Sequence, residues 1–119
     1  MIFLHYPACG TCKKAKQWLE EKGTAYTPRD IKAEHPALEE LRNWVERSGL
    51  PLKRFFNTSG QQYRALGLKD RLSALSEEEQ LTLLASDGML VKRPILVGED
   101  FVLVGFRPKE WAEKLGVSE

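Results

Sequence analysis

The two cysteines of the chain stand three positions apart, between a predicted strand and a predicted helix. Residues 2–6 form a short apolar run that ends at Pro7, which is typical of a first strand. Just past Cys9, apolar residues recur with helical spacing as far as Gly23, a residue type that commonly ends helices. A Cys-x-x-Cys motif at a strand-to-helix junction restricts the fold more than any other feature of this sequence.

The pattern beyond this helix predicts a second strand and then a long helical block. We expect the strand at residues 25–27, ending there or continuing toward Ile31. A strand, a helix and a strand in this order favour a parallel pair with a right-handed crossover. Helices are expected over most of residues 36–88, with Pro36 at a first helical position and a capping box at residues 76–79.

The end of the chain returns to strands. Residues 95–97 and 101–104 flank a Gly-Glu-Asp turn and predict a β-hairpin, and a final helix follows Pro108. The order of elements predicts an α/β protein with a thioredoxin-like fold, in which a helical insertion separates an N-terminal βαβ unit from a C-terminal ββα unit. We expect one domain over residues 1–119, with the insertion at approximately residues 36–88.

The position of the cysteines suggests different roles for them. Only a thiolate is a good nucleophile, and a free cysteine has a pKa of about 8.5. Cys9 falls at the predicted start of a helix, where unpaired N–H groups and the positive end of the dipole favour an anion. Cys12 lies one turn further on the same face and is expected to be the more shielded thiol. We therefore predict that Cys9 attacks and that Cys12 resolves the resulting adduct.

Two other interpretations of the cysteine pair are considered. The pair could consist of two buried and inert thiols, although a strand-to-helix junction makes this less common. The pair could also be half of a zinc site, but a structural zinc ion needs four ligands. Beyond the cysteines, the only histidines are His5, within a predicted strand, and His35. We therefore predict no metal site.

Charge and hydropathy exclude several classes of partner. The formal net charge is +1, so the sequence offers no basic face for direct contact with nucleic acid. No apolar run approaches the ~20 residues that span a membrane. The N-terminus lacks the basic region of a signal peptide, so we expect a cytoplasmic protein. In that reducing compartment a cysteine pair is more often catalytic, regulatory or metal-binding than a lasting disulfide.

Two Arg-Pro pairs near the end of the chain add a second cue. Arg93 and Pro94 come directly before a predicted strand, and Arg107 precedes the proline that starts the last helix. Proline has no N–H to donate, so it suits the start or the edge of a strand. The simplest interpretation of each arginine, taken alone, is a solvated surface residue.

Three runs of sequence together resemble the glutaredoxin-related arsenate reductase (ArsC) family. They are the cysteine motif at residues 6–15, the Lys-Arg-Pro-Ile run at residues 92–95 and the Val-Gly-Phe-Arg-Pro run at residues 104–108. The likeness extends over nearly the whole chain, including a Tyr-x-x-Leu-Gly-Leu stretch at residues 63–68. The family also includes the Spx and MgsR regulators, which bind RNA polymerase.

The resemblance implies an activity and a set of site residues. In arsenate reductases of this type, the cysteine at the helix start attacks arsenate, and glutathione with glutaredoxin then releases arsenite. Cys9 would be this nucleophile. Arg93 and Arg107 would hold the oxyanion, for which forked guanidinium donors are suited. Gly10 and Thr11, directly after the nucleophile, would contribute to the same oxyanion site.

The resemblance also implies that Pro94 is the cis-proline that faces the cysteine in this fold. The chain departs from the classical enzymes at two other positions. A third active-site arginine of those enzymes aligns with Asn57, and Arg54 lies nearby but is not aligned with it. Losing one charged contact would cost about 1.5–3 kcal/mol of anion binding. Cys12 stands where the classical enzymes have serine, as in the Spx and MgsR branch.

Two functions follow from the resemblance. The first is a thiol-dependent reductase that acts on an oxyanion or a disulfide, with no bound cofactor and with glutathione and glutaredoxin, or thioredoxin, as the reductant and redox partner. The second is a redox-sensing regulator in which oxidation of Cys9 and Cys12 changes a surface that binds the α subunit of RNA polymerase. In the second case residues 48–50 are the expected docking region.

Overall fold

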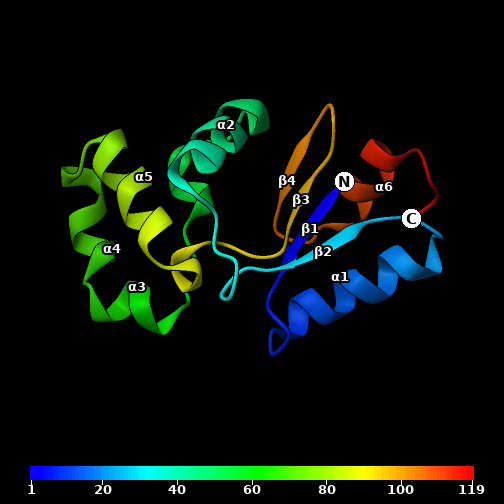
Figure 1. Ribbon diagram of the computed structural model, residues 1–119, viewed down its shortest axis with the longest axis horizontal. Coiled ribbons are helices and arrows are strands. Elements are labelled where there is room, and N and C mark those ends of the chain that lie inside the picture. The colour runs from blue at the N-terminus through cyan, green and yellow to red at the C-terminus, as the bar shows by residue number, and fades with distance from the viewer.

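The computed structural model describes residues 1–119 and places four strands in one mixed sheet (Figure 1). The strand order is β2 (Thr27–Asp30), β1 (Ile2–His5), β3 (Ile95–Val97) and β4 (Val102–Val104). Strands β1 and β2 are parallel, whereas β1 and β3, like β3 and β4, are antiparallel. The predicted parallel pair and C-terminal hairpin are both present, and they place the end of β1 near the middle of the sheet.

Two helices cover one face of the sheet. They are α1 (Gly10–Glu21) and α6 (Pro108–Leu115), which lie on the same side of the strands in Figure 1. Because side chains alternate along a strand, one set of strand residues meets these two helices. This side of the core contains Phe3, Ala15, Trp18, Leu19, Leu96, Leu103, Trp111 and Ala112.

The opposite face is covered by the helical block between β2 and β3. The first helix of the block is α2 (Leu38–Ser48), whose Leu41 and Trp44 share a core cluster with Leu4 and Ile95 of the sheet. The remaining elements extend away from the sheet in Figure 1: η1 (Leu52–Phe55), α3 (Gln61–Ala65), α4 (Leu68–Arg71), η2 (Leu72–Ala74), α5 (Glu77–Ser86) and η3 (Gly88–Leu90).

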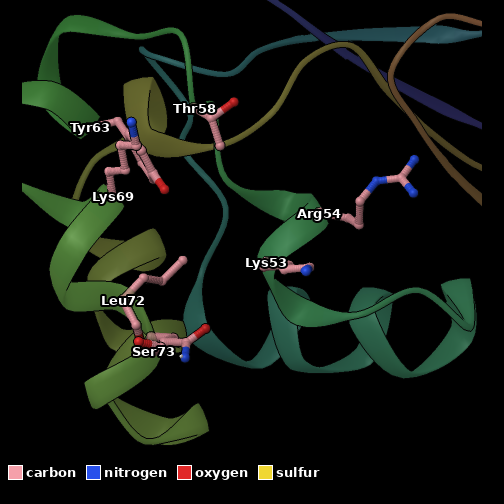
Figure 2. Close-up of a pocket in the computed structure, with 8 residues that line it drawn as sticks. Lys53, Arg54, Thr58, Tyr63, Lys69, Leu72 and Ser73 are labelled. Carbon is pink, nitrogen blue, oxygen red and sulfur yellow. Dashed lines mark hydrogen bonds between the residues drawn. The ribbon is translucent and has the colours of Figure 1, made fainter.

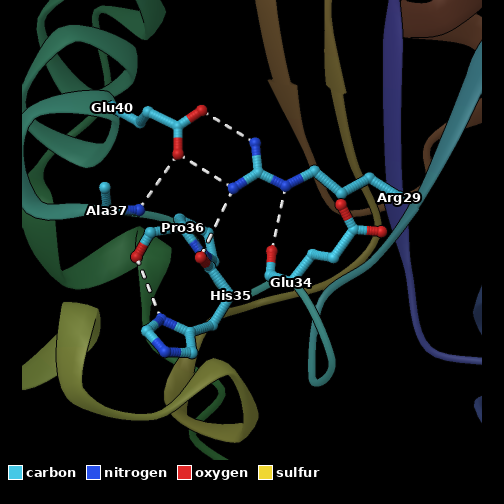
Figure 3. Close-up of polar contacts among 6 residues, drawn as sticks. All are labelled: Arg29, Glu34, His35, Pro36, Ala37 and Glu40. Carbon is cyan, nitrogen blue, oxygen red and sulfur yellow. Dashed lines mark hydrogen bonds and ion pairs between the residues drawn. The ribbon is translucent and has the colours of Figure 1, made fainter.

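An ion pair joins this block to the edge of the sheet. Arg29 on β2 donates two hydrogen bonds to the carboxylate of Glu40 on α2, at 2.7 and 2.8 Å (Figure 3). The same guanidinium donates to the carbonyl oxygen of Glu34 at 2.9 Å and lies 5.9 Å from the ring centre of Trp44. Arg29 therefore fixes the chain that leads from the sheet into α2.

Two predicted boundaries are wrong by a few residues. The second strand begins at Thr27, because Thr27 donates to the carbonyl oxygen of Met1 and pairs with Ile2. It extends toward the fully buried Ile31, as one of the two predicted ends allowed. Helix α2 begins at Leu38 and not at Pro36, because the backbone of Ala37 is extended and its N–H donates to the Glu40 carboxylate.

The architecture is thioredoxin-like with a helical insertion, as the order of elements predicted. The predicted capping box is present at Ser76, whose hydroxyl accepts a hydrogen bond from Glu79 while the Glu79 carboxylate accepts one from Ser76. None of the helices is both long and apolar enough to cross a membrane.

Candidate active site

Cys9 is the residue that caps the first helix. Its backbone is extended, and its N–H donates to the carbonyl oxygen of Tyr6, so the chain turns sharply between β1 and α1. Its sulfur then accepts a hydrogen bond from the backbone N–H of Cys12 at 3.4 Å. The thiol thus takes the place that a serine or aspartate oxygen takes at most helix starts, and an anion is favoured there.

Cys12 lies one turn into α1 and is buried. Only 1% of its surface is exposed, whereas Cys9 is partly exposed. Burial is the main cause that raises the pKa of the Cys12 thiol to about 12, and the neighbouring Cys9 raises it further. At neutral pH Cys12 is therefore a protonated thiol behind Cys9.

The pKa of Cys9 is shifted in the opposite direction. Partial burial, the largest single cause, would raise it, but several contacts together lower it, led by those with the thiol and the N–H of Cys12. A polar contact with Arg93 and its positive charge add to the lowering. The net result is a Cys9 pKa below the ordinary thiol value of 9.0, which increases the fraction of nucleophilic thiolate near neutral pH.

Arg93 brings unused hydrogen-bond donors to this site. Its Nε and Nη1 atoms are buried and have no hydrogen-bond partner in the protein. Its guanidinium carbon lies 5.3 Å from the centre of the Tyr6 ring, which holds the side chain beside the cysteine loop. The peptide bond between Arg93 and Pro94 is cis. Buried donors without an acceptor are rare and costly, so an anion that reached them would be bound strongly.

The Cys9 side chain opens into a hollow of about 520 Å³, which we call the cysteine pocket. Its wall carries cations, amides and hydroxyls from the ends of the sheet and from the insertion. The lining residues are Tyr6, Cys9, Thr11, Lys32, Asn57, Ser59, Gly60, Gln61, Gln62, Met89, Lys92 and Arg93. A tetrahedral oxyanion would fill only a small part of this volume.

A second hollow of about 260 Å³ adjoins it, and we call it the arginine pocket. Thr11, Lys92 and Arg93 line both pockets. The arginine pocket also carries Arg54 and Arg107, so four cationic side chains surround a small space without any carboxylate. This charge and size suit a tetrahedral oxyanion or another compact anionic group.

Arg54 reaches the arginine pocket because of backbone pairing between the insertion and the segment before β3. Lys92 donates to the carbonyl oxygen of Phe55 at 2.7 Å, and Asn57 donates to that of Leu90 at 2.8 Å. Phe55 is fully buried and fixes this pairing. The residue before Phe55 is thereby held next to the residue that follows Lys92, which is Arg93.

Among the predicted site residues, Cys12 is buried behind Cys9, and Pro94 follows a cis peptide bond. The other predicted residues fall into three groups. Cys9, Thr11 and Arg93 meet at the cysteine pocket, and Arg107 joins Thr11 and Arg93 at the arginine pocket. Gly10 is exposed and lines neither pocket.

Three further features of the site were only partly expected. Asn57 is buried and lines the cysteine pocket, and its side chain accepts a hydrogen bond from Ser59. Sequence reasoning missed Lys92 and noted Arg54 only as a neighbour of the aligned position. The two Lys-Arg pairs at residues 53–54 and 92–93 were the available signal, but the backbone pairing between these segments was not visible in the sequence.

Comparison with known proteins places these features in one family. The model of the ArsC family matches residues 4–114. The protein YusI of Bacillus subtilis, which is uncharacterized, is 52% identical over 95% of this chain and 96% of its own length. The regulatory protein MgsR of Bacillus subtilis is 29% identical, over 92% of this chain and 86% of its own. The global transcriptional regulator Spx of Staphylococcus saprophyticus is 28% identical, over 87% of this chain and 78% of its own length.

Solved structures give the same result. The crystal structure of an ArsC family related protein from Bacteroides fragilis superposes with a TM-score of 0.93 at 57% identity and covers 96% of this chain and 95% of that one. A possible arsenate reductase from Streptococcus mutans superposes with a TM-score of 0.85 at 52% identity and covers 92% of this chain and 95% of that one. Both relatives match the helical insertion as well as the sheet, since so little of either chain is left uncovered.

Proposed function

Because the chain belongs to the ArsC family, we propose that it is a thiol-dependent reductase in which Cys9 is the nucleophile and Cys12 the resolving thiol. The observation that carries this proposal is the contrast between the two thiols. Cys9 is accessible with a lowered pKa, and Cys12 is buried one helical turn away with a pKa of about 12. An accessible thiol with a lowered pKa, followed by a shielded and protonated thiol, is the arrangement that a nucleophile and its resolving partner need.

In the first step the Cys9 thiolate attacks one sulfur of a substrate disulfide. A bond forms between Cys9 and that sulfur, the substrate S–S bond breaks, and the released thiolate takes a proton from solvent. The Cys12 N–H and the charge of Arg93 stabilise the attacking thiolate before the reaction. Because Cys12 stays protonated, it does not compete with Cys9 for the substrate.

In the second step Cys12 attacks the Cys9 sulfur. Burial is the larger cause of the high Cys12 pKa, but the neighbouring Cys9 also contributes, and that contribution falls once Cys9 is in a neutral mixed disulfide. Cys12 loses its proton to solvent, forms the Cys9–Cys12 disulfide and expels the second substrate thiolate. The two electrons have then passed to the substrate, and an external thiol reductant such as glutathione, or a dithiol protein, restores the Cys9 and Cys12 thiols.

The two pockets favour a substrate that is longer than a free oxyanion. The cysteine pocket, at about 520 Å³, offers room for a small disulfide next to Cys9, and the adjoining arginine pocket offers cations for its anionic group. Arsenate is the alternative substrate. The Cys9 thiolate would displace hydroxide from arsenate held by Arg93 and Arg107, and attack by Cys12 would release arsenite as arsenic gains two electrons.

The test is to trap the intermediate with oxidised glutathione and to measure intact mass. We expect Cys12→Ser to accumulate one glutathionyl group on Cys9, whereas the unaltered chain forms an internal disulfide and Cys9→Ser forms neither product. The proposal fails if Cys9→Ser and Cys12→Ser become glutathionylated at the same rate. A parallel incubation with arsenate and a thiol reductant shows whether arsenite is also formed.

A second candidate function rests on the regulatory relatives. Spx and MgsR share the family with this chain. A regulator in which the same two cysteines become oxidised as a redox signal would need no substrate pocket. The candidate predicts that the chain binds the C-terminal domain of the polymerase α subunit through residues 48–50. Co-elution of the two purified proteins, in reduced and oxidised form, tests it, and the absence of a complex in both forms excludes it.

A further inference from the structure

A third pocket lies wholly within the insertion, away from both cysteines. It has a volume of about 460 Å³ and lies between η1 on one side and the α3, α4 and η2 segment on the other (Figure 2). We propose that this insertion pocket binds a small organic anion that carries an apolar body. The proposal names a ligand site separate from Cys9, because neither cysteine lines it.

All charged side chains that line the insertion pocket are positive. Lys53, Arg54 and Lys69 line it, and no aspartate or glutamate does. None of these cations takes part in an ion pair in the structure, although Arg29 and Arg42 elsewhere on the surface do. Lysine charges beside one hollow repel one another, and an anion in that hollow relieves the repulsion. The Arg54 guanidinium, which points away from Tyr63 and Lys69 in Figure 2, contributes least to this repulsion.

The inner wall of the insertion pocket is apolar and firmly held. Tyr63 and the largely buried Leu72 face the space, and the Tyr63 ring packs on Phe56 with ring centres 6.3 Å apart. The Gln80 amide donates to the carbonyl oxygens of Leu72 and Leu75, so it braces this wall. A carbon-lined wall beside free cations suits an aromatic or aliphatic body with one anionic group, whereas a bare inorganic anion would leave the wall uncovered.

Arg54 connects the insertion pocket to the arginine pocket. It lines both, and in Figure 2 its side chain points away from Tyr63 and Lys69. An occupant of the insertion pocket therefore shares a wall residue with the anion site next to Arg93. We expect each ligand to change the affinity of the other by the same factor. This coupling rests on the proposed function, but binding in the insertion pocket does not.

The experiment is an NMR titration of the Cys9→Ser chain with phenyl phosphate, which supplies both an anion and an aromatic ring. We expect saturating amide shifts at Thr58, Tyr63, Lys69 and Ser73. Inorganic phosphate, which lacks the ring, is the matched probe and should shift only residues of the arginine pocket such as Thr11 and Arg107. Because Cys9 is absent, the result does not depend on whether the chain is a reductase.

Two variants make the test specific. Lys69→Ala removes an exposed lysine from the insertion pocket and should weaken phenyl phosphate binding there about tenfold, the effect of one charge-assisted contact. Lys109→Ala on α6 removes an exposed lysine outside all three pockets and should leave the affinity unchanged. The proposal is overturned if the shifts around Tyr63 do not saturate, or if Lys69→Ala binds as tightly as the Lys109→Ala control.

Discussion

The backbone N–H of Cys12 donates a hydrogen bond to the sulfur of Cys9 at 3.4 Å. This contact joins the two thiols through the first turn of α1, so the geometry that stabilises a thiolate on Cys9 also places the Cys12 side chain behind it. A helix start supplies the unpaired backbone N–H groups that this arrangement needs. The two thiols are therefore coupled, and we expect a change at either one to alter the pKa of the other.

Arg93 is predicted to affect both the pKa of the Cys9 thiol and the binding of an anionic substrate. We expect Arg93→Ala to raise the pKa of Cys9, because a polar contact and a positive charge are lost. We also expect kcat/KM for an anionic disulfide to fall roughly ten- to a hundredfold. Steady-state kinetics with oxidised glutathione, together with a pH profile of Cys9 alkylation, measure the two effects. A fall in kcat/KM without any change in the Cys9 profile would contradict the dual role.

Arg54 is predicted to affect the binding of an anionic substrate and not the pKa of Cys9. It lines the arginine pocket but is not among the groups that lower the Cys9 pKa. Arg54→Ala should therefore raise KM for oxidised glutathione about tenfold and leave the Cys9 alkylation profile unchanged. A neutral disulfide such as hydroxyethyl disulfide should show little change in KM. Equal losses with the charged and the neutral substrate would mean that Arg54 acts through the fold and not through charge.

Glu40 is predicted to stabilise the fold in a pH-dependent way. Hydrogen bonds from Arg29 hold the pKa of Glu40 below its ordinary value of 4.5. The folded state thus binds its proton less readily than the unfolded state, and the stabilisation is present above pH 4.5 and is lost as the pH falls through the lower folded pKa.

We expect Glu40→Gln to lower the free energy of unfolding by about 1 kcal/mol at neutral pH, a value reduced for partial exposure, and to flatten the acid limb of the stability curve. Urea unfolding over a series of pH values measures both. The exposed Arg42–Glu78 pair is the control, and Glu78→Gln should have the smaller effect. If the two variants lose the same stability, the Arg29 contact does not fix the insertion to the sheet.

Substitution by alanine is predicted to destabilise the fold at one glycine, Gly88, and not at another, Gly10. A Cβ atom at Gly88 would come within 1.8 Å of the carbonyl oxygen of Ile31, so the backbone would have to move. Gly88→Ala should cost about 3 kcal/mol of unfolding free energy. A Cβ at Gly10 would meet nothing within 4 Å, so Gly10→Ala should change stability by less than about 0.5 kcal/mol. Thermal unfolding of both variants checks the contrast, and a similar loss at the two positions would contradict it.

The difference in burial between the two cysteines could be predicted from the sequence because it depends on local geometry. The spacing of Cys9 and Cys12 places them on one face of a helix, and the apolar strand before them fixes where that helix starts. The difference in burial follows directly, since the first position of a helix is open and the next turn faces the sheet. The parallel pairing of β1 with β2 and the β3–β4 hairpin followed from similarly local patterns.

The position of Arg54 could not be predicted in this way. Alignment with the family directs attention to Asn57, which is buried and already bonded to Ser59. Arg54 reaches the arginine pocket only through the pairing of Phe55 with Lys92, which joins segments far apart in the chain. The start of α2 at Leu38 was also missed, because its N-cap residue, Ala37, has no side chain that could mark a helix start.

The most direct test of the account is the pH dependence of alkylation, measured separately for Cys9 and Cys12 by peptide mass mapping. The account predicts that Cys9 reaches half-maximal reactivity at a lower pH than an unperturbed cysteine thiol measured in parallel, whereas Cys12 stays unreactive until the pH approaches its pKa of about 12. Measurement in Cys12→Ser and Cys9→Ser separates the two titrations, which influence each other in the intact pair. Two thiols that titrate together near the ordinary value, or a Cys12 that reacts first, would contradict the assignment of nucleophile and resolving thiol.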